Sequence, residues 1–124
     1  MIVDDNEAVI SIVGQLLKNE GFEVCSALGG KACIESIRDL NPSILLLDVI
    51  MPDMDGWDVL RELKSMGVLD KTKVIMLTVV KEPKEEDEDA DLSPYVMSPY
   101  IMDYITKPFD GDELIERVKR LSLL

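Results

Sequence analysis

The sequence predicts an α/β fold: one domain over residues 1–124, built on a doubly wound, five-stranded parallel sheet with helices on both faces. Segments of strand-forming residues alternate with segments whose apolar residues recur at helical spacing. Two of the strand segments are aliphatic without alternation, which is typical of parallel strands buried on both faces. The length of 124 residues suits a single hydrophobic core. We expect the strand order 2-1-3-4-5.

Turn residues and helical segments separate the five expected strands. The first is a short segment that ends at two aspartates. The second is rich in β-formers and is broken by Gly29 and Gly30. The third and fourth are the aliphatic strands. In chain order, the expected strands are residues 2–3, 22–27, 43–48, 73–78 and 100–106.

Helices are predicted between these strands. The first covers residues 7–19, the second ends before Pro42, and the third starts near Gly56. The last begins after Asp110, which we expect to be its N-cap. The residues expected to face the core are Val9, Ile12, Val13, Leu16, Leu17, Cys33, Ile34, Ile37, Leu40, Val59, Leu60, Leu63, Met66, Leu114, Ile115, Val118 and Leu121.

The fourth-helix region, within residues 81–102, is atypical. It contains Pro83, Pro94 and Pro99. Because proline ends or kinks a helix, we do not expect a full amphipathic helix here. Residues 82–91 hold seven acids and one lysine. We favour a solvated face for this run, and a docking surface for a basic partner is the alternative.

Composition excludes several classes of function. The net charge of −12 argues against direct nucleic-acid binding, which needs clustered lysine and arginine. The chain has no histidine, which excludes Ser-His-Asp catalysis, His-ligated metals and an internal phosphohistidine donor. No apolar stretch is long enough to cross a bilayer, and the start lacks a signal-peptide pattern. We therefore expect a cytoplasmic protein without a membrane partner.

Acidic residues follow two of the expected strands. Asp4 and Asp5 come after the first strand, and Asp48 ends the third. In the order 2-1-3-4-5 these strands are neighbours, so the three acids would meet where open α/β sheets bind ligands. Two carboxylates about 4 Å apart repel by roughly 4 kcal/mol at an effective dielectric near 20. A divalent cation relieves that repulsion, and oxygen ligands of this kind suit Mg²⁺.

A hydroxyl and an ammonium belong to the same edge of the expected sheet. Thr78 closes the fourth strand, and Lys107 follows the fifth, where the next residue, Pro108, favours extended backbone. Three carboxylates, a hydroxyl and an ammonium around a cation suit phosphoryl transfer, with Asp48 as the nucleophile. Each feature alone is weak, because an Asp pair is more often a helix cap or a turn. It is their joint placement at the ends of four strands that indicates a phosphoryl-transfer site.

Over essentially its whole length the sequence resembles the response-regulator receiver domains of two-component signalling. The segments that carry the resemblance are Ile2-Val3-Asp4-Asp5-Asn6, Leu45-Leu46-Leu47-Asp48-Val49-Ile50-Met51-Pro52-Asp53-Met54-Asp55-Gly56, Leu77-Thr78 and Asp103-Tyr104-Ile105-Thr106-Lys107-Pro108-Phe109. The resemblance implies a phosphoacceptor switch that catalyses only its own phosphorylation and dephosphorylation. Asp48 would accept a phosphoryl group from a partner histidine kinase or phosphotransfer protein.

The resemblance also implies a role for each site residue. Asp5, Asp48 and the backbone carbonyl of Ile50 would bind Mg²⁺ directly, and Asp4 would hold a metal-bound water. Lys107 would contact the phosphoryl oxygens across a cis bond to the following proline.

Two further residues would form the family's switch. Thr78 would move toward the phosphoryl group, and Tyr104 would swing inward behind it. The surface formed by the fourth helix, fifth strand and last helix would then change for a downstream partner. The sequence leaves the cognate kinase, the output and the oligomeric state open, with a homodimer as one option.

The sequence departs from the family near the phosphoryl site. Val79 stands where the family usually has a small residue, and it could crowd the pocket. Ile50 and Val80 are apolar at positions near the path of an attacking water. Our hypothesis is slow self-hydrolysis, and loss of the phosphoryl group in minutes or less would count against it.

Two alternatives remain open at this stage. A degenerate receiver would keep the fold and bind a partner without phosphorylation, but retention of the acid pair and of Lys107 argues against it. A Mg²⁺-dependent hydrolase of the haloacid-dehalogenase type would need a second acid two residues after the nucleophile, where Ile50 stands. Asp53 and Asp55 resemble a metal motif of nucleic-acid enzymes, but they fall in an expected turn.

Overall fold

A computed structural model describes residues 1–79 and 98–124, and it shows a five-stranded parallel sheet in the order β2-β1-β3-β4-β5. The predicted fold class and strand order are confirmed. In chain order the strands are β1 (Ile2–Asp4), β2 (Ser26–Leu28), β3 (Ile44–Asp48), β4 (Lys73–Thr78) and β5 (Ile101–Thr106). The fourth strand has the predicted bounds, and the third and fifth begin one residue later than expected.

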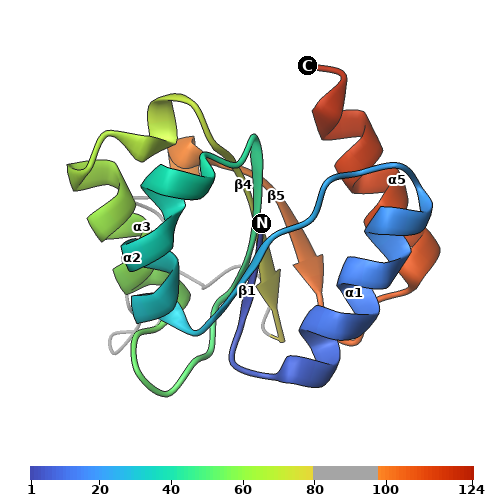
Figure 1. The fold of residues 1–124 in the computed structure, drawn as a ribbon, viewed down its shortest axis with the longest axis horizontal. Helices are drawn as coiled ribbons and strands as arrows, with labels where there is room; N and C mark the ends of the chain where they lie inside the picture. The colour runs from blue at the N-terminus through green and yellow to red at the C-terminus, as the bar shows by residue number, and fades with distance from the viewer. Residues whose placement is uncertain (80–97) are drawn as a thin grey trace, which may run out of the picture.

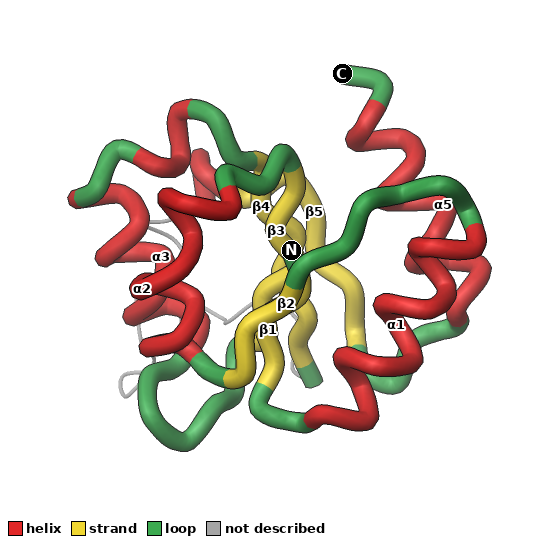
Figure 2. Tube along the Cα trace, in the orientation of Figure 1, coloured by secondary structure: helices red, strands yellow, loops and turns green. Residues whose placement is uncertain are grey.

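Helices cover both faces of the sheet (Figure 1). Those in the described part of the chain are α1 (Glu7–Asn19), α2 (Gly30–Leu40), α3 (Gly56–Ser65) and α5 (Gly111–Ser122). Figure 2 shows α2 and α3 on one side of the strands and α1 and α5 on the other. Short 3₁₀ turns, Val68–Asp70 and Ser98–Tyr100, precede β4 and β5. None of the described helices has the length and apolarity that a bilayer crossing demands.

The central strands are buried on both faces, as their lack of alternation predicts. Leu45 and Leu47 of β3 pack into the core cluster beneath α2 and α3, while Leu46 packs into the cluster beneath α1 and α5. Successive side chains of a strand point to opposite faces of the sheet, so consecutive aliphatic residues pack into both core clusters. The predicted core face of α5 is confirmed, since its four residues are all buried: Leu114, Ile115, Val118 and Leu121.

The second strand is present in its predicted place in the sheet, but its predicted bounds are wrong. Residues 22–27 were expected, but β2 is Ser26–Leu28, because it pairs in parallel with the short β1 at Ile2 to Asp4. Phe22 and Val24 are partly buried against the α1 and α5 cluster from a connecting segment. Their β-forming character therefore reflects packing rather than strand pairing.

Two predicted core residues are instead exposed. The side chain of Ile12 is 62% exposed and that of Leu40 is 45% exposed. Val13 and Leu17 define the buried side of α1. Because one residue turns an α-helix by about 100°, Ile12 lies at the border of that side.

The expectation of an atypical fourth helix lies largely outside the described residues, as do Val80, Pro83, Pro94 and the acidic run 82–91. Of that region, Pro99 falls in the 3₁₀ turn before β5.

Gly56, the first residue of α3, has no room for a side chain. A Cβ there would lie 2.6 Å from the carbonyl oxygen of Asp48 and 2.9 Å from the Cα of Val49. We predict that Gly56→Ala lowers the free energy of unfolding by about 1–3 kcal/mol, because backbone must shift to admit the methyl group. Urea unfolding of the metal-free protein measures this.

Gly14→Ala is the matched control. A Cβ at Gly14 would make only ordinary contacts, 3.6 Å from Val24 and 3.7 Å from Ile2. Alanine favours the helix by up to about 1 kcal/mol over glycine. This variant should be as stable as the parent or more so, and an unchanged Gly56→Ala midpoint would contradict the steric argument.

Candidate phosphoacceptor and metal site

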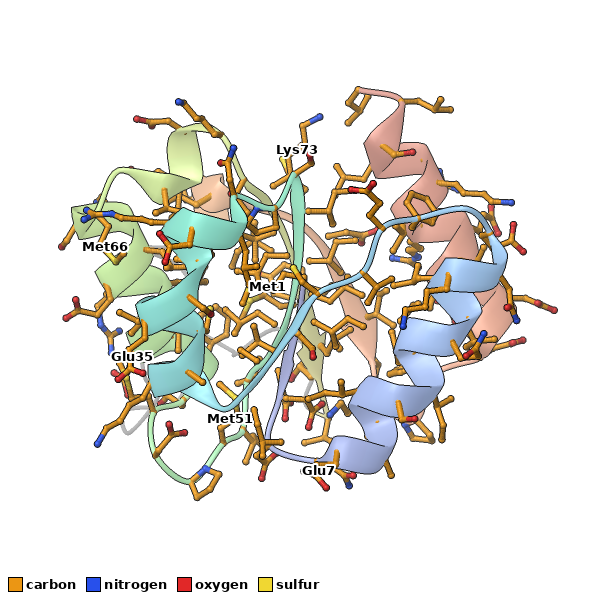
Figure 3. The ribbon with its side chains drawn as sticks, viewed as in Figure 1. Met1, Glu7, Glu35, Met51, Met66 and Lys73 are labelled. Atoms are coloured by element: carbon orange, nitrogen blue, oxygen red, sulfur yellow. The ribbon has the colours of Figure 1, made fainter. Side chains whose placement is uncertain are left out.

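The carboxyl ends of β1 and β3 bring three acids together. Asp4 is the last residue of β1 and Asp48 the last of β3, and these strands pair directly. Carboxylate oxygens of Asp4, Asp5 and Asp48 all lie within 4.8 Å of one another. Figure 3 shows Glu7 and Met51, which follow these strand ends, at one edge of the molecule, and Lys73 of β4 at the opposite edge. The acids thus lie at the edge that the sequence predicted.

Burial differs among the three acids. Asp4 is 1% exposed and Asp48 is 5% exposed, whereas Asp5 is exposed. The side chain of Asp4 accepts a hydrogen bond from the backbone N–H of Asn6 at 3.0 Å. Asn6 is also the N-cap of α1, where its side chain accepts from the N–H groups of Ala8 and Val9. One residue therefore joins the orientation of Asp4 to the start of the helix.

Lys107 faces the acids. Its Nζ lies 2.8 Å from Oδ2 of Asp4 and 3.3 Å from Oδ1 of Asp48. The backbone places it there, because its N–H donates to the carbonyl of Thr78 at 2.7 Å and extends the pairing of β4 with β5. The peptide bond between Lys107 and Pro108 is cis.

Burial and neighbouring charge shift the pKa of Asp48. Removal from water is the largest cause that raises this pKa, and the charge of Asp4 adds to the rise, while Lys107 and the N–H of Ile50 oppose it. The resulting pKa is about 6. For Lys107, burial lowers the pKa, but its hydrogen bond to Asp4 and the two nearby negative charges outweigh burial and leave the pKa raised. Lys107 therefore stays charged while Asp48 remains short of compensating positive charge.

The donor set fits a hard divalent cation. Three carboxylates face one ammonium, so the cluster keeps an excess of negative charge. Burial, and next the charge of Asp4, raise the pKa of Asp48 and so disfavour its ionised form, an effect that a cation would relieve. Carboxylate oxygens at this spacing are the ligands that Mg²⁺ prefers.

Thr78 ends β4 beside the site, and Tyr104 lies further back on β5, opposite Met76. Thr78 is the last residue of β4, is 7% exposed and follows Leu77, which pairs with Asp48. Tyr104 is half-buried in β5 and packs against the α2 and α3 cluster. The sequence grouped these residues with the acids, and the fold places them on the two strands beyond β3.

Two apolar side chains are exposed around the site. Ile50 is 58% exposed, and its backbone N–H helps to lower the pKa of Asp48. Val79 is 55% exposed, so its side chain does not pack into the floor of the site. Its effect on phosphoryl entry stays a prediction.

Sequence reasoning missed several residues that shape the site. Asp53 and Asp55 form helix caps: Asp55 accepts from the N–H of Asp58 at the start of α3, and Asp53 accepts from N–H groups of α2. Asn6 was noted only as part of a motif, although an asparagine before a helix is a recognisable N-cap signal. The partner of Asp53 lies 22 residues away, and no local pattern indicates it.

Comparisons with known proteins agree with this geometry. The family model of the response regulator receiver domain matches residues 1–119. The chain therefore belongs to the response regulator receiver domain family, whose members are phosphoacceptor signalling domains.

Solved structures of receiver proteins resemble the chain over nearly its full length. A CheY-like receiver domain protein from Methanospirillum hungatei is 33% identical with a TM-score of 0.81, covering 100% of this chain and 96% of that one. A response regulator from Chloroflexus aurantiacus, called putative, is 28% identical with a TM-score of 0.79, covering 99% and 95%. TrrA from Thermotoga maritima, solved in complex with Mg(2+)-BeF, is 28% identical with a TM-score of 0.75, covering 97% and 95%.

The raised pKa of Asp48 predicts a pH-dependent gain in stability for Asp48→Asn. The folded protein holds a proton on Asp48 up to about pH 6, whereas the unfolded chain releases it near pH 4. Stability from this group is therefore present at low pH and is lost as pH rises from about 4 to 6. We expect Asp48→Asn to be more stable than the metal-free parent by about 1–3 kcal/mol at pH 7, and equal to it near pH 3.5.

Thermal unfolding in chelator across this pH range measures the difference. Asp70→Asn is the control, because Asp70 is an exposed acid beside the amino end of β4, away from the cluster. A gain independent of pH, or one shared by Asp70→Asn, would contradict the electrostatic account.

Proposed function

We propose that this chain is a phosphoacceptor switch that moves a phosphoryl group from a phosphohistidine of a partner kinase or phosphotransfer protein to Asp48. The observation that supports this most is the position of the Lys107 ammonium, 2.8 Å from Asp4 and 3.3 Å from Asp48 within a cluster of three acids. A structural ion pair needs one acid, whereas phosphoryl transfer needs a nucleophile, a cation site and a positive group together.

Asp5, Asp48 and the backbone carbonyl of Ile50 would hold Mg²⁺, and Asp4 would hold it through water. When bound, Mg²⁺ would neutralise charge on the transferring phosphoryl oxygens. Ile50 follows Asp48 by two residues, and its backbone lies near enough to lower the pKa of Asp48, which supports this assignment.

The transfer balances without a further reactant. An oxygen of Asp48 attacks phosphorus, the bond between phosphorus and the donor imidazole nitrogen breaks, and that nitrogen keeps the electron pair. Lys107 stays protonated and offsets negative charge on the phosphoryl oxygens. The product is an acyl phosphate, and the chain acts only on its own carboxylate rather than as an enzyme with turnover.

The proposed switch runs through Thr78 and Tyr104. Arg117 of α5 links this region to the last helix, since it donates to the side chain of Asp103 at 2.6 Å and to the carbonyl of Tyr104 at 3.2 Å. The same guanidinium donates to Glu113 at 3.1 Å. A rearrangement at Tyr104 would therefore reach α5 and alter the surface offered to a downstream protein. We also propose that residues 1–124 act as one domain in the cytoplasm.

The deciding experiment is incubation with acetyl phosphate and Mg²⁺, followed by intact mass. We predict a single phosphoryl adduct that Asp48→Asn abolishes and chelator prevents. Lys107→Ala should slow its formation by about 10²-fold or more, because one positive group at the transferring oxygens is lost.

Lys73→Ala is the matched lysine control, because Lys73 lies at the opposite edge of the sheet (Figure 3). It should form the adduct at the parental rate. Mg²⁺ binding without any adduct would instead indicate a degenerate receiver. Sustained turnover of a small phosphate ester would indicate a hydrolase.

A further inference from the structure

The segment 49–55 between Asp48 and α3, the acceptor loop, is held by backbone hydrogen bonds at both ends. The N–H of Val49 donates to the carbonyl of Leu77 at 3.0 Å. The N–H of Gly56 donates back to the carbonyl of Val49 at 2.7 Å, which closes the loop on itself. These two bonds hold the start and the end of the acceptor loop, but they do not hold its middle.

Asp53 ties the middle of the acceptor loop to a different helix. Its Oδ2 accepts from the N–H of Lys31 at 3.1 Å, and its Oδ1 accepts from the N–H of Gly30 at 3.4 Å. These are the first two residues of α2, whose own N-cap, Gly29, has no side chain. Asp53 therefore caps a helix 22 residues before it in the chain. The N–H of Lys31 and the other backbone donors lower the pKa of Asp53, so the cap stays ionised at neutral pH.

Gly29 and Gly30, at the start of α2, leave room for the acceptor loop to lie against the helix. A Cβ on Gly29 would lie 3.2 Å from Oδ2 of Asp53, and the φ of Gly29 is +97°, which disfavours other residues. A Cβ on Gly30 would lie 2.9 Å from the Cβ of Met54 and 2.8 Å from Cγ2 of Val59. The acceptor loop is thus seated on the start of α2 by hydrogen bonds and by close packing.

We propose that Asp53 is a positioning residue that sets the affinity of the site for Mg²⁺ by holding the acceptor loop in place through α2. This rests on the proposed function, in which the loop supplies the Ile50 carbonyl to the cation. A ligand on a free loop must be ordered when the metal binds, and that ordering weakens binding. A loop already held by Asp53 is ordered on folding, so the metal meets a preformed ligand. Asp53 touches neither the cation nor the phosphoryl group in this proposal.

The test compares Asp53→Ala and Asp53→Asn with Thr72→Ala. The hydroxyl of Thr72 is buried and donates to the carbonyl of Pro42 at 2.8 Å, before β4 and away from the acceptor loop. Thr72→Ala therefore lowers stability without touching the loop. Mg²⁺ affinity is measured by calorimetry and by the fluorescence of Trp57, a buried residue in the first turn of α3. Amide hydrogen exchange of the metal-free proteins follows the acceptor loop and the start of α2.

Asp53→Ala should raise the Kd for Mg²⁺ about tenfold, as for residues that orient metal ligands. Asp53→Asn keeps one acceptor oxygen and should fall between Asp53→Ala and the parent. In metal-free Asp53→Ala, exchange should quicken at Gly30, Lys31 and the acceptor loop. Thr72→Ala should keep the parental Kd even if it lowers the melting temperature as much.

Parental Mg²⁺ affinity in Asp53→Ala would overturn the positioning role and leave the phosphoacceptor function intact. Equal weakening by Thr72→Ala would also overturn it, because stability alone would then explain the change. Failure of the parent protein itself to bind Mg²⁺ would overturn the proposed function and this inference together.

Discussion

The ammonium of Lys107 is the group that allows two buried acids to share one edge of the sheet. Asp4 and Asp48 are almost fully buried, and each carboxylate lies within ion-pair distance of Lys107. Burying one charge without a partner costs several kcal/mol, and burying two like charges costs more. The compensation is incomplete, because the pKa of Asp48 remains raised. That remaining imbalance is the physical basis of our proposal that the site binds a cation and accepts a phosphoryl group whose oxygens Lys107 neutralises.

The sheet order brings these residues together from distant parts of the chain. Asp4 and Lys107 are 103 residues apart and hydrogen-bond directly. The strands are parallel, so the last residues of β1, β3, β4 and β5 all lie at the carboxyl-terminal edge of the sheet. The N-terminal ends of two helices also help to position the site. Asn6 joins Asp4 to α1, and Asp53 joins the acceptor loop to α2. The site is therefore held by strand ends and helix caps together.

The elements of the fold that could be predicted are those marked by a pattern of neighbouring residues in the sequence. The aliphatic run before Asp48 identified β3 because a strand buried on both faces needs apolar residues at every position. The N-cap at Asp110 and the core face of α5 were readable from residue type and helical spacing. The bounds of β2 were wrong because pairing with a short β1, rather than local composition, decides them. The role of Asp53 as a cap of α2 was missed because the N–H groups that it accepts from are remote in the sequence. Ile12 was wrongly predicted to face the core because a single helical step separates buried from exposed positions.

The most direct test of the central claim is a crystal structure of the protein with Mn²⁺ in place of Mg²⁺, located by anomalous scattering. We predict one ion bound by the carboxylates of Asp5 and Asp48, with the Lys107 ammonium still directed at Asp4 and Asp48. An ion bound elsewhere on the acidic surface, or Lys107 turned away from Asp4 and Asp48, would contradict it.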